Sequence, residues 1–499
     1  MNGSGWRSLF DRRPLELLQR ELEADARRPL LRRVIGPIDL MLMGIGVIVG
    51  AGIFVVTGTA AALYAGPAIT LSFLLAGLAC ALSAMCYAEL AAMIPAAGSA
   101  YTYAYATLGE LVAWVVGWNL VLEYVFAASY VAVGWSGYFG SFLQHWGLTL
   151  PPALARAPLS SVNGQLVWAA GVNLPAIAIV LFMAAIALRG IALSRTVNVI
   201  IVALKLAALS LVIVLGAAHI NPHLWHPFIP PAVDGGALGG GSFGWGGVLR
   251  GAGVIFVAYL GFDAIATTAQ ETRNPQRSLP IAIIGALCIA TLLYIVVSLV
   301  LTGLVPYQTL NVPDPLSTAL RSTGPSLAWL VTVVDAAAVI GLASVILVAL
   351  LAQSRILFAM SRDGLLPALL GRIHPRTRVP HWSTTLSAIV IAVLAGCFPI
   401  GILVQLVSIG TLGIFIVVCL AVIILRRTAP DRPRAFRAPW VPVLPVLGVI
   451  VCAYILLGLP SRVWHLYGAW ILGGLLIYTF YGHRGARAPR PKAAHDLVV

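Results

Sequence analysis

MGIGVIVGAGIFVVTG, residues 43–58, opens the first long apolar segment of the chain and decides the fold. Its composition suits a lipid bilayer, yet glycine occupies positions 44, 46, 50, 52 and 58. In one interpretation, these glycines only let neighbouring helices pack closely. They wrap around several faces of a helix instead of forming one stripe, however, and glycine weakens a helix interior. We therefore predict a true break in this helix at about residues 48–52.

The composition of the whole chain indicates a membrane protein. Hydrophobic residues make up 60% and charged residues 10% of the sequence, and the mean hydropathy is +0.96, whereas about a quarter of a soluble chain is charged. Only helices and closed barrels satisfy backbone groups in lipid, and the apolar runs are too long and continuous for barrel strands. The fold class is thus predicted to be an all-α polytopic membrane protein. Twelve spans are expected, at about 37–63, 67–94, 110–143, 173–191, 194–217, 247–270, 280–304, 326–360, 382–400, 401–426, 437–459 and 464–481.

The charge distribution predicts the orientation. The net charge is +14, but most arginines fall in the tails and in alternate loops, while the other loops hold only Arg156, Arg321 and Arg462, with Arg250 at a helix start. Because basic loops stay in the cytoplasm, both termini are expected inside a bacterial cell membrane. Attraction to anionic lipids then explains the basic character, and nucleic acid is not expected as a partner. No cleavable signal is expected, and the six cysteines all fall in predicted spans, without a disulfide or metal pattern.

A second irregularity lies in the sixth predicted span, which carries Ala258, Gly261 and an embedded Asp263. Broken membrane helices are tolerated where their free backbone groups line a cavity and meet a ligand. The N-terminal end of a half-helix offers N–H groups that suit a carboxylate. Breaks in the first and sixth spans are what two five-helix repeats of inverted topology would produce.

Several longer motifs carry a family resemblance: GVIVGAGIF, YAEL, GWNLVLEY, VGWSGYF, FVAYLGFDAIATTAQETRNPQRSLP and RILFAMSRDGLLP. Over about residues 30–480 the chain resembles the amino acid–polyamine–organocation permeases, in particular the bacterial cationic amino acid transporter branch. The resemblance implies a leucine-transporter-like five-plus-five inverted repeat that imports amino acids by alternating access. The implied parts are a basic cytoplasmic tail at 1–35, a first repeat at 36–217, an extracellular loop at 218–246, a second repeat at 247–426, two further helices at 427–482 and a cytoplasmic tail at 483–499.

The resemblance also implies a substrate site at the two breaks. Backbone amides of the first break would hold the substrate carboxylate, and carbonyls and side chains of the sixth-span break would meet the amino group and side chain. Val257 departs from the aromatic gate that relatives often carry, so either gating passes to its neighbours Phe256 or Tyr259, or the occluded pocket is less well sealed. The expected site residues are Ile48, Gly50, Ala51 and Gly52 in the first break and Val257, Ala258, Tyr259 and Leu260 in the second.

Embedded charges are costly in a bilayer and are therefore candidates for function. Glu123 would either favour cationic side chains or join a proton path, whereas Asp335 lies near a span end and could simply be solvated. Burial disfavours the charged amine of Lys205, which would let it exchange a proton near physiological pH. Alternatively, Lys205 forms a permanent ion pair with Asp263 or Glu123.

The resemblance favours proton coupling, because proton-coupled relatives carry a lysine at this position of the fifth helix. The ammonium of Lys205 is expected to bridge the first-helix break, near Val47–Gly50, and a hydroxyl of the eighth span, for which Ser344 is the candidate. Asp263 is also expected to take part in the coupling. Glu89, near the inner end of the second span, is expected to have a structural role.

The function predicted from the sequence is proton-coupled symport of small neutral or cationic amino acids. The protein is not expected to be an enzyme, since the chain has no G-x-x-x-x-G-K-[ST] phosphate loop and no nucleophile with a nearby histidine in a span. No metal or cofactor is expected, and the coupling ion is a proton. The expected partners are the amino acid substrate and membrane lipids. The chain is expected to act as a monomer. The alternative function is an amino acid sensor or an uncoupled exchanger or leak of the same fold.

Overall fold

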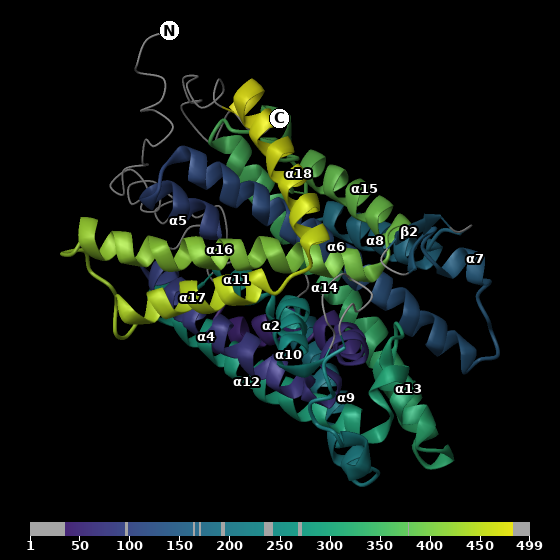
Figure 1. Cartoon of the computed structure of the whole chain (residues 1–499). Helices are drawn as coiled ribbons and strands as arrows, with labels where there is room; N and C mark the ends of the chain where they lie inside the picture. The colour runs from purple at the N-terminus through teal and green to yellow at the C-terminus, as the bar shows by residue number, and fades with distance from the viewer. Residues whose placement is uncertain are drawn as a thin grey trace.

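The computed structural model describes residues 35–94, 98–162, 165–168, 171–190, 195–233, 243–267, 272–377 and 379–482. These residues form a helical bundle with one small hairpin (Figure 1). The predicted basic tails at 1–35 and 483–499 lie outside the described residues, apart from Ile35, as does the middle of the predicted loop at 218–246.

Within the described residues, the first half of the chain is mainly helical and contains one hairpin. In the hairpin, strands β1 (Leu159–Val162) and β2 (Gln165–Trp168) pair antiparallel, with Leu159 opposite Trp168. The helices are α2 (Pro37–Ile48), α3 (Thr57–Ala60), α4 (Ile69–Met93), α5 (Ser99–Thr107), α6 (Glu110–Gln144), α7 (Pro152–Ala155), α8 (Leu174–Leu188) and α9 (Arg195–Ala217).

The second half continues the bundle. Its helices are α10 (Gly244–Ile255), α11 (Phe262–Thr267), α12 (Pro275–Leu304), α13 (Pro315–Ser322), α14 (Ala328–Arg362), α15 (His381–Cys397), α16 (Ile400–Thr428), α17 (Val443–Leu457) and α18 (Ser461–Ile477).

Local sequence signals explain several helix ends. The Asn173 side chain accepts a hydrogen bond from the Ala176 N–H at 3.2 Å, so it caps α8, whose second position is a proline. At the C-terminal end of α16, Arg426 and Arg427 occupy the last turn, where positive charges interact favourably with the negative end of the helix dipole. These two helix ends lie at the predicted limits of their spans, residue 173 and residue 426, within about two residues.

The prediction of an all-helical membrane protein is confirmed. In the described residues, 7 helical stretches are long and apolar enough to cross a membrane, and three shorter apolar helices, α8, α15 and α17, accompany them. The broken sixth span, α10 through α11, adds two half-helices. The count of twelve spans, the five-plus-five repeat and the domain limits remain predictions.

The packing brings the two predicted breaks to the centre of the bundle. Helix α12 packs along α4 and α2, α6 packs along α14 and α16, and α9 packs against α2 and α14. Figure 1 shows α2 and α10 drawn close together, with α4 and α12 on one side of them and α13 on the other. Segments about two hundred residues apart in the sequence therefore meet there.

Candidate functional site

The first helix is interrupted inside the predicted range of 48–52. Helix α2 ends at Ile48, and Val49 leaves the helical region with a ψ of 72°. The N–H of Gly50 turns back to the Ile48 carbonyl at 2.7 Å, and a π-helical turn begins at Gly52. This break exposes the last carbonyl oxygens of α2 to side chains from other helices.

The sixth span is interrupted as well. Helix α10 gives way to a 3₁₀ turn at Phe256–Tyr259, and Leu260 is extended, with a ψ of 141°. Gly261 follows with a φ of +120°, a conformation that glycine adopts readily, before α11 starts at Phe262. The structure thus contains both of the interruptions predicted from the sequence.

The two breaks are in direct contact. A Cβ atom built on Gly52 would overlap the Cβ and Cα of Ala258. A Cβ on Gly261 would lie 2.6 Å from the side chain of Val47 and 3.1 Å from the Ile48 nitrogen. Glycine at these two positions is therefore required by close approach of two backbones, in addition to any effect on helix continuity.

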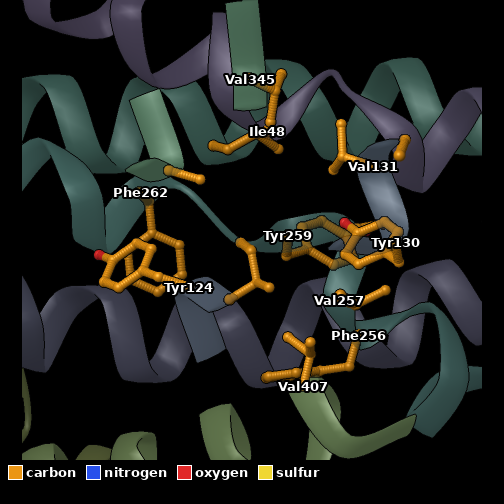
Figure 2. Close-up of a cluster of buried hydrophobic side chains, with 14 of the residues drawn as sticks. Ile48, Tyr124, Tyr130, Val131, Phe256, Val257, Tyr259, Phe262, Val345 and Val407 are labelled. Atoms are coloured by element: carbon orange, nitrogen blue, oxygen red, sulfur yellow. The ribbon is translucent and has the colours of Figure 1, made fainter. Parts of the chain in front are cut away.

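A buried cavity of ≈ 30 Å³ lies beside the breaks. That volume holds roughly two water molecules, so an amino acid requires its walls to move apart. Figure 2 shows a cluster of buried hydrophobic side chains that includes several of the lining residues. Ile48 and Val345 lie on one side of this cluster, and Phe256 and Val407, which do not line the cavity, lie on the other. The cavity is lined by Val47, Ile48, Ala51, Glu123, Tyr124, Ala127, Tyr130, Val131, Val257, Leu260, Gly261, Val345, Val348 and Ala349.

The predicted substrate residues fall into two groups. Ile48, Ala51, Glu123, Val257 and Leu260 line the cavity. Of the others, Gly50 and Gly52 belong to the first break, and Ala258 is the surface against which Gly52 packs. Tyr259 points away from this group, because its hydroxyl donates to the Phe73 carbonyl at 2.8 Å.

Two buried carboxyl groups adjoin the cavity. Asp263 is 2% exposed and accepts hydrogen bonds from the Tyr124 hydroxyl at 2.6 Å and from the Gly261 N–H at 3.1 Å. Glu123 is also 2% exposed, has the Thr411 side chain as a hydrogen-bond partner and is close enough to Asp263 to feel its charge. Both carboxyl groups therefore lie in the interior of the bundle, next to residues that line the cavity.

Lys205 lies on the other side of the first break. It is 1% exposed, and its amine donates to the carbonyl oxygens of Gly46 at 2.6 Å and Val49 at 3.2 Å. Gly341 of α14 leaves room for its aliphatic chain. The expected partner Ser344 instead donates to the Gly341 carbonyl of its own helix, at 2.7 Å. The structure thus brings Lys205 to the first break, while the hydrogen bond of Ser344 stays within α14.

The other embedded acids, Asp335 and Glu89, make polar contacts at opposite ends of the bundle. Asp335 is fully buried and accepts hydrogen bonds from Ser141 at 2.5 Å and from Ser317, and it pairs with His145 at 3.1 Å. Nearby, Arg321 pairs with Asp314, which precedes α13. These contacts join α6, α13 and α14 at the end predicted to face outside.

Glu89 makes a structural cluster at the opposite end. Both of its carboxylate oxygens accept hydrogen bonds from Arg426 at 2.8 Å, and the Ala438 N–H donates to it at 2.8 Å. Arg434 lies 3.1 Å away as an ion-pair partner. The carboxylate thus joins α4 to α16 and to the segment that follows α16, which agrees with the structural role expected for it.

Several residues of the site were not predicted. Tyr130, Val131 and Val345 line the cavity, and Tyr294 contacts both breaks. Tyr294 and Tyr130 carry hydroxyl groups within largely apolar runs, and such a pattern is only a weak signal of a functional residue. Their partners lie far away in the sequence, so spacing alone could not identify them.

Known proteins resemble this chain over most of its length. A family model described as amino acid permease matches residues 35–480. The chain is 45% identical to a methylthioribose transporter of Bacillus subtilis over 477 residues, 96% of this chain and 98% of that protein. It is 42% identical to the branched-chain amino acid permease BcaP of the same organism, over 96% of this chain and 99% of the relative. It is also 40% identical to the vacuolar cationic amino acid transporter 4 of Arabidopsis thaliana, over 80% of this chain and 64% of the relative.

Proposed function

The chain belongs to the amino acid permease family, and from this premise we propose that it imports amino acids by proton-coupled symport. Like the family and its relatives, it is a multi-pass membrane transport protein and not an enzyme. The proposed location is a bacterial cell membrane, with both termini in the cytoplasm and the chain acting as a monomer. The proton is the only coupling ion or cofactor in this proposal.

One observation carries the proposal: two interrupted helices meet backbone to backbone beside a buried cavity. Free N–H groups at the start of the half-helix after Gly50 suit a carboxylate. Carbonyl oxygens around Val257 and Leu260 suit an amino group. These two features match the constant part of every α-amino acid, and the cavity walls are left to meet the side chain.

The side-chain part of the cavity supports small neutral substrates first. Its walls are valine, leucine and alanine side chains, with Glu123 as the acidic group and tyrosine hydroxyls beside it. An ionised Glu123 would extend the range to cationic side chains, and a protonated one would not. The name of the BcaP relative adds branched-chain amino acids to the candidates.

A second candidate substrate comes from the methylthioribose transporter. Such a substrate has hydroxyl groups but neither a carboxylate nor an amino group. It would therefore use the buried carboxyls and tyrosines and not the amide end of the half-helix. Methylthioribose belongs in any panel of test substrates.

Proton coupling is supported by Lys205 at the first break and by the carboxyl pair Glu123 and Asp263 next to the cavity. A proton on Lys205 strengthens its bonds to the carbonyl end of α2, since the negative end of the helix dipole lies there. Loss of that proton weakens the bonds and frees the break to move. Ser344, one turn along α14 from Gly341, would line the path of this change.

The test is uptake into liposomes that contain the purified protein. An inward proton gradient should drive concentrative uptake of at least one labelled amino acid, and a protonophore should abolish it. Replacing external potassium with sodium should change nothing. Counterflow of labelled substrate separates the rivals, because a sensor binds without exchange and a leak shows no saturation. Competition by unlabelled leucine, alanine, arginine and methylthioribose then ranks the substrates.

A further inference from the structure

Tyr294 of α12 lies between the two breaks. Its side chain is fully buried, and its hydroxyl is 2.5 Å from the Ile48 carbonyl oxygen and 2.8 Å from the Ala258 carbonyl oxygen. A phenol has one proton, so Tyr294 donates to one of these oxygens at a time. One hydroxyl on a third helix therefore serves the backbone of both breaks.

We propose that Tyr294 is a positioning residue that holds the two breaks at one spacing, so that they recognise substrate as a unit. This inference rests on the proposed function, because it assigns Tyr294 a role in the same substrate site. It concerns affinity for the substrate, whatever the side chain of that substrate is.

Tyr294 contacts the two breaks without lining the cavity itself. Within the described part of the chain, the cavity lining includes Ile48 from the first break and Val257, Leu260 and Gly261 from the second, and Tyr294 is not among the lining residues. Its hydroxyl faces carbonyl oxygens of the same two segments. The residue thus acts on the shape of the site through the backbone and not through contact with substrate.

The Tyr294 hydroxyl is needed to hold the two breaks together, because it lies between a carbonyl oxygen of each. Two carbonyl oxygens that approach the same point repel each other, and the Tyr294 hydroxyl lies between them. Without it the Ile48 carbonyl keeps, among the described residues, only its bond from the Gly50 N–H, and the buried Ala258 carbonyl loses the donor from α12, which is costly. The contacts of Gly52 with Ala258 and of Gly261 with Val47 add van der Waals packing between the breaks, but packing of this kind is less directional than a hydrogen bond. The shared proton of Tyr294 supplies the attraction, so its loss should let the breaks separate.

Replacement by phenylalanine isolates the hydroxyl. The Tyr294 ring packs against Phe73 with centroids 5.2 Å apart and against Tyr259 at 5.3 Å. A phenylalanine ring keeps these contacts, since both are made by the ring and not by the oxygen. The matched control is Tyr138→Phe, which removes another buried tyrosine hydroxyl that donates to a first-span carbonyl, that of Phe54, beyond the break.

The experiment compares wild type, Tyr294→Phe and Tyr138→Phe in liposomes, with labelled leucine, alanine and arginine as probes. We expect Tyr294→Phe to raise the KM of the transported probe about tenfold, with a much smaller change in maximal rate, and Tyr138→Phe to keep the wild-type KM. Binding is read independently, from the rise in melting temperature that the probe causes in each purified protein. That rise should shrink in Tyr294→Phe alone.

The possible failures are distinguishable. If Tyr294→Phe keeps the wild-type KM and the full ligand-induced rise in melting temperature, the positioning role is wrong, whether or not the protein is less stable or slower. If both variants raise KM equally, the effect is a general loss of a buried hydrogen bond and the proposal is also wrong. A wild type that shows no saturable uptake of any probe overturns the proposed amino acid transport and this inference with it.

Discussion

The amine of Lys205 donates a hydrogen bond to the carbonyl oxygen of Gly46 at 2.6 Å, across 159 residues of sequence. This bond joins α9 to the last turn of α2, immediately before the break beside the cavity. A proton gained or lost by one side chain can thereby change how firmly the break is held. The proposed coupling of proton and substrate depends on this contact.

Replacing Lys205 with methionine should abolish concentrative uptake driven by an inward proton gradient. Methionine has a similar length but cannot donate to the Gly46 and Val49 carbonyls. Counterflow between equal proton concentrations should continue, since exchange needs no net proton movement. The gradient supplies about 2.3 kcal/mol per charge for each 100 mV, and a variant that still concentrates substrate would show that Lys205 is only structural.

Replacing Gly52 with alanine should abolish saturable substrate binding. The new Cβ would overlap Ala258 and push the two breaks apart, and Gly52→Val should be at least as damaging. Gly140→Ala on α6 is the control, because nothing lies within 4 Å of its Cβ position. Competition binding should show wild-type affinity for Gly140→Ala. Equal affinity in Gly52→Ala would mean that the close contact at this glycine is dispensable.

Replacing Glu123 with glutamine separates the two roles open to this carboxyl. Loss of inhibition by arginine and lysine, with alanine uptake intact, would assign it to the recognition of cationic side chains. Loss of all proton-driven uptake, with counterflow intact, would assign it to the proton path that includes Asp263. Uptake and competition profiles indistinguishable from wild type would contradict both.

Asp314 should make the stability of the outer contacts depend on pH. Burial raises the pKa of Asp314 to about 6, although the neighbouring Arg321 lowers it. Because the pKa of the folded protein is above the ordinary value of 3.8, the folded protein binds the proton more tightly than the unfolded chain does. This contribution to stability is fully present below pH 3.8 and is lost as the pH rises through about 6. Asp314→Asn should flatten the fall in melting temperature that wild type shows between about pH 4 and about pH 6. An equal fall in both proteins would rule out Asp314 as its source.

Replacing Glu89 with alanine should destabilise the protein without changing its affinity for substrate. The change leaves the buried Arg434 and the Arg426 guanidinium without their carboxylate, at a cost of about 3–5 kcal/mol for a buried pair. Thermal unfolding in detergent should show a large loss of stability. Asp431→Ala, an exposed acid on the same segment, should melt like wild type. A changed KM with wild-type stability in Glu89→Ala would place this acid in the transport machinery instead.

The sequence by itself determined the class of the molecule and the position of its irregularities. Composition and the length of the apolar runs indicated a helical membrane protein, because backbone N–H and C=O groups in lipid must form their hydrogen bonds within the segment itself. Glycines at 50 and 52 marked the first break, and Gly261 marked the second. These are local effects, since a helix is weakened by its own residues and its own hydrogen-bond pattern.

The partners of the buried polar groups were decided only by the tertiary structure. The sequence left open whether Lys205 pairs with a carboxylate or with the first break, and the packing of α9 against α2 directs its amine to two carbonyls. Tyr294 had no distinguishing pattern, yet it lies 246 residues from Ile48 and within hydrogen-bond distance of it. In a medium without water, a buried polar group needs a donor or acceptor within the protein, and when that partner lies in another helix, the packing of the whole bundle decides which helix it is.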